Sequence, residues 1–327
     1  MNFELKSLGL VGAAGEKCDD MVVLVPQGFK PGNDALSQLI AQALKAGDLE
    51  TKAGKLLLAY RSPGLACTRV MLAGAGEGGA KAVRQAVAAA VAALKGGPVK
   101  SLSVVFADAP QAGAVRAVLL AVAEASYAYT TTKSKPEARK LQTVLVAVPS
   151  PEGAKAEFER AQAAVLGIEL AKEWANRPAN HATPTMLAQA AKALSKHRQI
   201  SCEVMGPAQV AKLGMGSFLA VARGSQEPLR FIVLKYAGAA KSVAPVVLVG
   251  KGISFDSGGI SLKPSAEMDE MKFDMSGAAS VLGVFRALGQ LQPTLNVIGL
   301  VPACENMPDG RAVKPGDVVT SMSGQTI

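Results

Sequence analysis

The glycine-rich stretch from Val246 to Leu282 constrains this chain more than any other. It reads VVLVGKGISFDSGGISLKPSAEMDEMKFDMSGAASVL. The β-branched run Val246–Val249 predicts a buried strand. Glycines at positions 250, 252, 258 and 259 then break the strand and let the backbone approach another group closely. Charged side chains between such glycines are a poor way to build a core, so the stretch predicts a functional site.

Four charged residues give this stretch the chemistry of a metal site. Lys251, Asp256 and Lys263 stand among the glycines. Asp274 lies near the start of a helix that we expect from about Met271 to Leu288. Carboxylates hold cations, a lysine amine binds a metal only when neutral, and a protonated lysine can polarise a carbonyl. The spacing leaves open which lysine does which, and it also allows salt-bridged loop residues.

Two neighbours of Asp274 extend the pattern. Glu270 lies four residues before it, where two like charges repel only weakly on a surface. Met271 lies three residues before Asp274, on the same face of the expected helix. Met271 therefore either lines a substrate pocket beside a metal ion or is an ordinary core methionine.

Three glycine-containing segments resemble well-known motifs but do not support the functions of those motifs. Gly74–Gly79 matches GxGxxG, but the next acidic residue, Asp108, is well past the ~20-residue offset of a ribose ligand, which favours a tight strand–helix turn over dinucleotide binding. Gly252–Asp256 ends in aspartate and is not a GxSxG nucleophile elbow. Gly250-Lys251 is followed by glycine and is not a P-loop.

We expect His181 to be a capping or loop residue.

Cysteines and histidines narrow the hydrolytic options further. The four cysteines share no CxxC spacing, and in a chain of 327 residues we expect them to be reduced and mostly buried. With only His181 and His197, a His-rich zinc site or a Ser-His-Asp triad is hard to assemble. Any hydrolytic chemistry must use carboxylates and lysines. The cysteines are Cys18, Cys67, Cys202 and Cys304.

Charge and hydropathy bear on partners and location. The net charge is +9, and residues 1–150 carry 17 Lys and Arg against 11 Asp and Glu. This excess could favour a polyanion such as DNA, although a soluble surface with a positive bias explains it as well. No window reaches the ~18 uncharged apolar residues of a membrane span. The N-terminus, MNFELKSLGL, alternates like a strand and lacks a signal peptide's apolar region. We expect a cytoplasmic protein.

Residues 1–150 predict an α/β domain, because strands alternate with helices as in a mostly parallel sheet. A long helical pattern then runs from Pro151 to Pro178, and we assign residues 151–180 to a connecting helix. The same helix could be the last one of the first domain. The expected strands are Phe3–Leu10, Met21–Pro26, Leu56–Tyr60, Val70–Ala73, Leu102–Ala107 and Thr143–Val148, with helices at Ala35–Ala46, Lys81–Leu94 and Ala114–Tyr127.

Residues 181–327 predict a second α/β domain. Thr183-Pro184 provides an N-cap with proline at the first helical position, and the helix should run to about His197. The expected strands are Ser201–Met205, Phe218–Ala222, Arg230–Tyr236, Val246–Val249 and Asn296–Val301.

The segment VGKGISFDSGGISLKPSAEMDEMKFDMSGAA closely resembles the metal-binding segment of the leucyl aminopeptidases, the cytosol aminopeptidase family. AKEWANRPANHATP is similar to the family's Asn-rich segment, and VPACENMPDGRAVKPGDVVTSMSGQTI to the strand and loop that follow. The resemblance is strong over Ala171–Ile327 and weak before it, where the family has a macro-domain-like α/β module. It implies that module plus a C-terminal α/β metallopeptidase domain.

The resemblance also implies residue roles. Lys251 and Asp274 would bind the tighter metal, Asp256 would bridge both ions, and Lys263 would be the catalytic lysine. Met271 would line the specificity pocket. The implied reaction releases an N-terminal amino acid, preferably a bulky apolar one, from a peptide, by water activated between two divalent ions (Mn²⁺ or Zn²⁺). The resemblance further implies a hexamer.

The chain departs from the family at its C-terminal end. The family continues past the position of Ile327 with an NTDAEGRL-like motif, whose aspartate and glutamate complete the metal site and whose arginine is thought to hold bicarbonate. We therefore expect residues 1–327 alone to be inactive. The alternative is a non-catalytic DNA-binding protein that uses the basic N-terminal half, since some bacterial members of the family also bind DNA.

Overall fold

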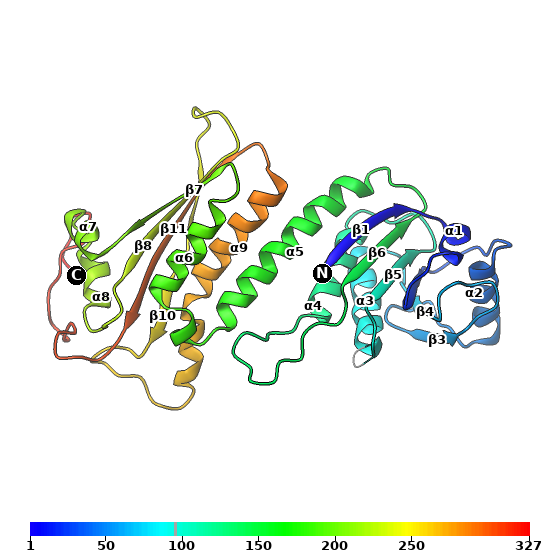
Figure 1. Cartoon of the computed structure of the whole chain (residues 1–327), viewed down its shortest axis with the longest axis horizontal. Coiled ribbons are helices and arrows are strands. Elements are labelled where there is room, and N and C mark those ends of the chain that lie inside the picture. The colour runs from blue at the N-terminus through cyan, green and yellow to red at the C-terminus, as the bar shows by residue number, and fades with distance from the viewer. Residues whose placement is uncertain (95–96) are drawn as a thin grey trace. The chain divides into compact units, whose positions relative to one another are not determined.

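Two β-sheets organise the chain, one in each of two units. The computed structural model describes residues 1–94 and 97–327. Unit 1 is Met1–Val165 and unit 2 is Leu166–Ile327. The boundary falls within helix α5 (Ala154–Asn176), which lies inside the range expected for a connecting helix (Figure 1).

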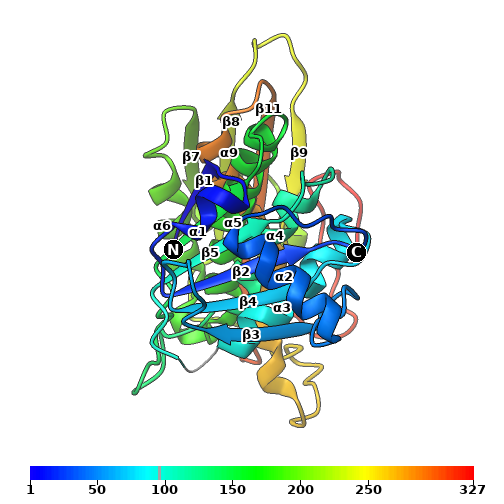
Figure 2. The same cartoon turned by 90° about the vertical axis from the view of Figure 1, so that its right-hand side faces the viewer.

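The sheet of unit 1 has six strands in the order β1-β6-β5-β2-β4-β3. β3 pairs antiparallel with β4, and the other pairs are parallel. Figure 2 shows β2, β4 and β3 side by side. The mostly parallel α/β arrangement expected from the sequence is confirmed. The strands are β1 (Asn2–Ser7), β2 (Asp20–Val25), β3 (Leu56–Tyr60), β4 (Arg69–Gly74), β5 (Ser101–Phe106) and β6 (Thr143–Val148).

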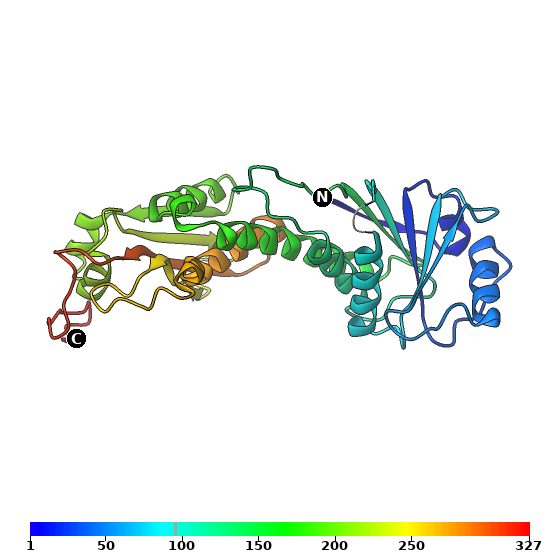
Figure 3. The same ribbon diagram turned by 90° about the horizontal axis from the view of Figure 1, so that it is seen from below.

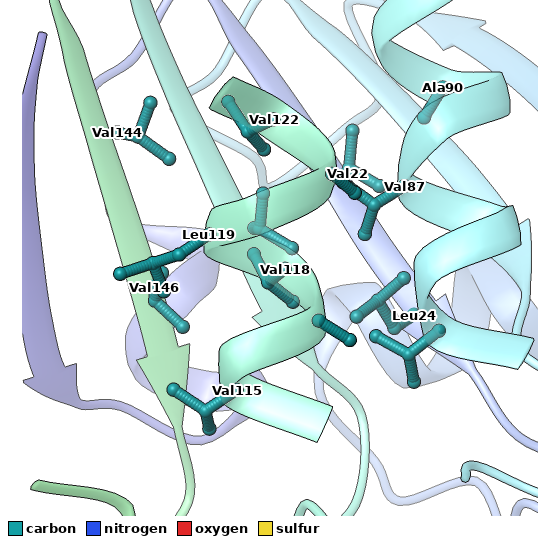
Figure 4. Packing of buried hydrophobic residues seen from close by; sticks show 14 of the residues in the cluster. Val22, Leu24, Val87, Ala90, Val115, Val118, Leu119, Val122, Val144 and Val146 are labelled. Atoms are coloured by element: carbon teal, nitrogen blue, oxygen red, sulfur yellow. The ribbon is translucent and has the colours of Figure 1, made fainter. Parts of the chain in front are cut away.

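Helices cover both faces of this sheet because successive side chains of a strand point to opposite faces. In β2, Val22 and Leu24 join the core under α3 (Ala80–Leu94) and α4 (Ala114–Ala125). Met21 and Val23 join the core under α1 (Leu10–Ala14) and α2 (Ala35–Ala46). Figure 3 shows α3 in cyan and α2 in blue on opposite sides of the strands. Figure 4 shows Val22 and Leu24 with the α3 and α4 side chains that cover them.

The sheet of unit 2 has the order β10-β11-β8-β7, and β9 also pairs with β11. β9 and β10 are successive parallel partners of β11, with Val249 opposite Leu300 and Gly252 opposite Ala303. β9 and β10 together form one edge strand of the sheet, which is interrupted at residues 250 and 251. The strands are β7 (Ile200–Met205), β8 (Arg230–Ala237), β9 (Val246–Val249), β10 (Gly252–Asp256) and β11 (Asn296–Asn306).

Helices also lie on both faces of the second sheet. In β8, Ile232 packs with α6 (Pro184–Leu194) and α9 (Ser276–Leu291), whereas the adjacent Phe231 packs in the cluster that includes side chains of α7 (Pro207–Lys212) and α8 (Gly216–Ala222). Two short 3₁₀ segments precede α6 and α9: η1 (Ala179–His181), which contains His181, and η2 (Met268–Met275). Within the described residues, no helix combines the length and hydrophobicity that crossing a membrane requires.

Three expectations about individual elements are wrong. Residues 218–222 belong to helix α8 and not to a strand, because periodicity cannot distinguish a short apolar strand from a short buried helix. β1 ends at Ser7, and Leu10 already begins α1. The helix expected from Met271 begins only at Ser276, so Asp274 lies in η2.

The segment of α5 in unit 2 approaches α9 closely at two glycines. A Cβ on Gly167 would lie 2.5 Å from the Gly283 carbonyl oxygen, and a Cβ on Gly283 would lie 2.6 Å from the Gly167 oxygen. Both distances are shorter than real Cβ contacts, so only glycine fits at either position. Trp174, the only tryptophan of the chain, lies two turns further along α5 and packs on the core of unit 2.

We predict that Gly283→Val pushes α9 away from α5 and destabilises unit 2 by about 1–3 kcal/mol. Urea unfolding followed by Trp174 fluorescence measures this loss. Gln290→Val is the matched control, because Gln290 is exposed on the same helix, and its unfolding midpoint should stay close to that of the wild type. Equal midpoints for the two variants would show that the helices do not depend on this contact.

Candidate metal centre

The candidate site lies at the edge of the second sheet where three strand segments meet. Asp256 is the last residue of β10, and it stands opposite Asn306, the last residue of β11. Lys251 occupies the interruption between β9 and β10. Because β10 and β11 are parallel, their carboxyl ends reach the same edge of the sheet.

A tight turn after Asp256 brings Lys263 back to it. Gly258 and Gly259 have φ of +90° and +68°, a region that favours glycine. The Lys263 N–H then donates to the Ser257 carbonyl oxygen at 2.9 Å. Lys263 Nζ lies 2.7 Å from Asp256 Oδ2, 3.2 Å from the Asp256 carbonyl oxygen and 3.0 Å from Met271 Sδ. The structure therefore brings Asp256, Lys263 and Met271 together.

The second oxygen of Asp256 is also held. Oδ1 accepts from the Gly258 N–H at 2.9 Å and from Asn306 Nδ2 at 2.8 Å. Partial burial opposes ionisation of this carboxyl, but the hydrogen bonds from Lys263, Gly258 and Asn306 outweigh it and lower the Asp256 pKa. Asp256 is therefore a carboxylate at neutral pH, fixed in orientation by donors on both oxygens.

Lys251 and Asp274 form a second pair. Lys251 Nζ lies 2.7 Å from Asp274 Oδ1. The start of α9 abuts the backbone of Lys251: the Ala278 N–H donates to its carbonyl oxygen at 2.8 Å, and a Cβ on Gly277 would lie 2.7 Å from its nitrogen. Asp274 Oδ2 is buried and has no hydrogen-bond partner among the described residues. A buried carboxylate oxygen in this state is costly unless it binds something.

A buried thiol connects the two pairs. Burial above all, together with the charges of Asp256, Glu305 and Asp274, raises the pKa of Cys304, in β11, to about 12, and the charge of Lys251 opposes this shift. Both aspartates and Lys251 therefore lie within electrostatic range of one sulfur. The two ion pairs belong to one local site.

The residues present fit a divalent cation, but as a partial ligand set. The orphaned Asp274 Oδ2 and the ionised Asp256 offer oxygen ligands, and the lysines can supply an amine. Across residues 1–94 and 97–327, no three His, Cys, Asp or Glu side chains gather as a metal site would require. Of the donors proposed from the sequence, the structure thus supplies two carboxylates and an amine.

Asn306 is the site residue that the sequence reasoning missed. Its side-chain amide donates to Asp256. Its backbone carbonyl oxygen accepts from the Ser257 N–H at 3.0 Å and from the Ser257 hydroxyl at 2.7 Å. A Cβ on Gly259 would lie 2.8 Å from Asn306 Oδ1, so glycine leaves room for this amide. The available signal was a polar residue at the end of a mostly apolar strand, but its partner Asp256 is 50 residues away in the sequence.

Two family descriptions match the chain. Residues 22–136 match "Cytosol aminopeptidase family, N-terminal domain", and residues 169–327 match "Cytosol aminopeptidase family, catalytic domain". A protein of Albidiferax ferrireducens described as a probable cytosol aminopeptidase is 67% identical over the whole chain, which covers 68% of that relative. The corresponding protein of Verminephrobacter eiseniae is 64% identical, and the chain covers 63% of it. The chain thus spans about two thirds of the length of these relatives.

Two solved structures with a similar fold agree with these family matches. The bottromycin maturation enzyme BotP in complex with Mn is 33% identical with a TM-score of 0.77, over 94% of this chain and 64% of that one. A tomato leucine aminopeptidase mutant is 28% identical with a TM-score of 0.80, over 100% of this chain and 67% of that one. With both domain descriptions matched and a relative 67% identical along the whole chain, this protein belongs to the cytosol aminopeptidase family.

Proposed function

We propose that the protein is a metal-dependent aminopeptidase that releases N-terminal amino acids, preferably leucine-like ones, from peptides. The observation that carries this proposal is the pair of lysine–aspartate contacts with the orphaned Asp274 Oδ2 between β10 and α9. Membership of the cytosol aminopeptidase family supports the reaction class. The neighbours named as a leucine aminopeptidase and as a complex with Mn support the substrate preference and the metal.

Three residues of this chain would hold the metal ions. Lys251 and Asp274 would bind one ion, and Asp256 would bridge it to a second. When bound, two divalent ions supply Lewis-acid polarisation of a carbonyl and lower the pKa of water. Hydrogen bonds from Gly258, Asn306 and Lys263 fix the orientation in which the Asp256 carboxylate would meet the ions. Asn306 would keep that orientation.

Lys263 would bind the carbonyl oxygen of the scissile peptide bond. An ammonium has three donors, and the three contacts of Lys263 Nζ are the Asp256 carboxylate, the Asp256 carbonyl oxygen and Met271 Sδ. A thioether is a weak acceptor, so a substrate carbonyl would replace the contact with Met271 and leave the two contacts with Asp256 in place. There Lys263 would stabilise negative charge that develops on the oxygen. Met271 would then line the side-chain pocket.

Several finer points rest on the family resemblance. They are Mn²⁺ or Zn²⁺ as the metal, bicarbonate as a cofactor, assembly into a hexamer and a place in the cytoplasm, which the relatives' name also suggests. DNA binding rests only on the charge of residues 1–150. No contact among the described residues favours it, and we do not propose it as the function.

We predict that Lys263→Ala lowers kcat by roughly 10²–10³ without loss of bound metal, because Lys263 acts on the substrate and is not a ligand. The assay uses a chimera of this chain with the remaining C-terminal part of the Albidiferax ferrireducens relative. Lys272→Ala is the control, because this lysine lies 4.8 Å from the Phe273 ring centroid and has no assigned role. Normal turnover of the Lys263→Ala chimera would contradict the role of Lys263.

In the same chimera, we predict that three substitutions near the proposed centre affect Mn²⁺ binding to different extents. Asp256→Asn should remove both ions, because one bridging carboxylate is lost from each. Asn306→Ala should weaken Mn²⁺ binding by roughly 10–100-fold, since it only releases Asp256 from its fixed orientation. Asp269→Asn, an exposed change in η2, should leave metal content unchanged. Calorimetric titration with Mn²⁺ separates the three. Two tightly bound ions in the Asp256→Asn protein would refute the ligand assignment.

The third prediction concerns residues 1–327 alone. Their two carboxylates and lysine amine form a partial ligand set, so we expect at most one weakly bound ion and no release of leucine. The valines 246, 247 and 249 of β9 are more than half exposed, and this apolar edge should promote aggregation. Hydrolysis of a leucyl anilide with excess Mn²⁺ tests the activity. Turnover within about tenfold of the chimera would show that the missing ligands are not needed.

A further inference from the structure

Two cysteines of unit 1 lie beside each other, far in sequence from the metal centre. Cys18 and Cys67 each precede the first residue of a strand by two positions, Cys18 before β2 and Cys67 before β4. β2 and β4 are parallel neighbours, and Asp20 stands opposite Arg69. The two cysteines therefore lie at matching positions of adjacent chain segments, where the spacing of neighbouring strands falls in the Cα–Cα range of a disulfide.

The two thiols are neighbours in one core but differ in exposure. The Cys67 side chain is buried, whereas Cys18 is half-buried, and both are free thiols that pack in the same core. Cys67 Sγ lies 3.1 Å from the Arg69 carbonyl oxygen and also within hydrogen-bonding reach of the Cys18 sulfur. The Ser103 hydroxyl of β5 is a second donor to Cys18. Cys18 is therefore the accessible member and Cys67 the sheltered one.

These contacts shift the pKa values of the two thiols in opposite directions. Hydrogen bonds from Cys67 and Ser103 lower the pKa of Cys18, against the opposing effects of burial and of Glu16. The contact with Cys18 and burial raise the pKa of Cys67. A partly exposed cysteine with a lowered pKa is the kind that peroxides attack, and a neighbouring thiol is what resolves the product.

We propose that Cys18 and Cys67 are a peroxide-sensitive dithiol that closes to a disulfide. The Cys18 thiolate attacks one oxygen of hydrogen peroxide, the O–O bond breaks, and hydroxide leaves with Cys18 as a sulfenic acid. The Cys67 sulfur then attacks the Cys18 sulfur, the S–O bond breaks, and the leaving hydroxide takes the Cys67 proton as water. One peroxide, the Cys18 thiolate, the Cys67 thiol and the proton that Cys18 had already lost, which the first hydroxide takes up, give one disulfide and two waters.

The other two cysteines provide internal controls. Cys202 lies in β7 and Cys304 in β11, and β8 separates these strands within the second sheet. Burial raises the pKa of both thiols, and for Cys304 nearby acidic charges add to this effect. Both should react with peroxide more slowly than Cys18. The bond between Cys18 and Cys67 would link β2 to β4 and enclose α2 and β3, all within unit 1.

The test treats the folded wild-type chain with hydrogen peroxide and maps its cysteines by mass spectrometry. We expect a mass loss of about 2 Da, a linked peptide pair that contains Cys18 and Cys67, and recovery of both thiols with dithiothreitol. Cys18 should be consumed at least about tenfold faster than Cys202. Sulfinic acid on Cys18 beside a free Cys67, pairing with another cysteine, or equal rates for Cys18 and Cys202 would each overturn the proposal.

Variants assign the two roles. Cys67→Ser should leave a Cys18 sulfenic acid that dimedone traps, and Cys67→Ala replaces it if the serine at this buried position prevents folding. Cys18→Ser should slow oxidation of Cys67 at least about tenfold, because the attacking thiolate is gone. Cys202→Ser should form the bond at the wild-type rate. Rapid oxidation of Cys67 in the Cys18→Ser chain would overturn the assignment of Cys18 as the attacking thiol.

Discussion

The parallel pairing of β10 with β11 is the constraint on which the candidate metal centre depends. It sets Asp256 opposite Asn306, so the asparagine amide reaches one carboxylate oxygen while the glycine turn returns Lys263 to the other. The register shifts between Ile253 and Asp256, next to these contacts. An irregularity of this kind re-aims a side chain at the end of a strand.

Charge balance explains how two aspartates can lie in one site. Each carboxylate has a lysine 2.7 Å away, so the repulsion between Asp256 and Asp274 is offset locally. Lys251 is mostly exposed and can leave Asp274 at little cost, whereas Lys263 is more buried and has three contacts. This difference supports the proposed division of roles, with Lys251 as a ligand and Lys263 as the group that stays charged beside the substrate.

The sequence predicted those parts of the fold that depend on local pattern. The strand Val246–Val249 and the glycine turn after Asp256 follow from residue type alone, and both are present, although the strand is mostly exposed and not buried as expected. Asn306 could not be found this way, because its role depends on a pairing between segments 50 residues apart. Residues 218–222 were assigned wrongly because their short apolar run fits strand and helix equally well until tertiary packing decides. Sequence pattern therefore located the site but not the contacts that orient it.

Backbone contacts at glycine connect the metal centre to the rest of unit 2. A Cβ on Gly250 would lie 2.5 Å from the Gly277 carbonyl oxygen, so the strand edge rests directly on the first turn of α9. Further along, Gly283 of α9 rests on Gly167 of α5 in the same way. Side chains on flexible stems can adjust by rotamer changes, but backbone atoms in contact cannot. The positions of Lys251 and Asp274 are therefore set by a chain of backbone contacts, and an added methyl group at Gly250 or Gly277 would separate the two residues that would share one ion in the proposed centre.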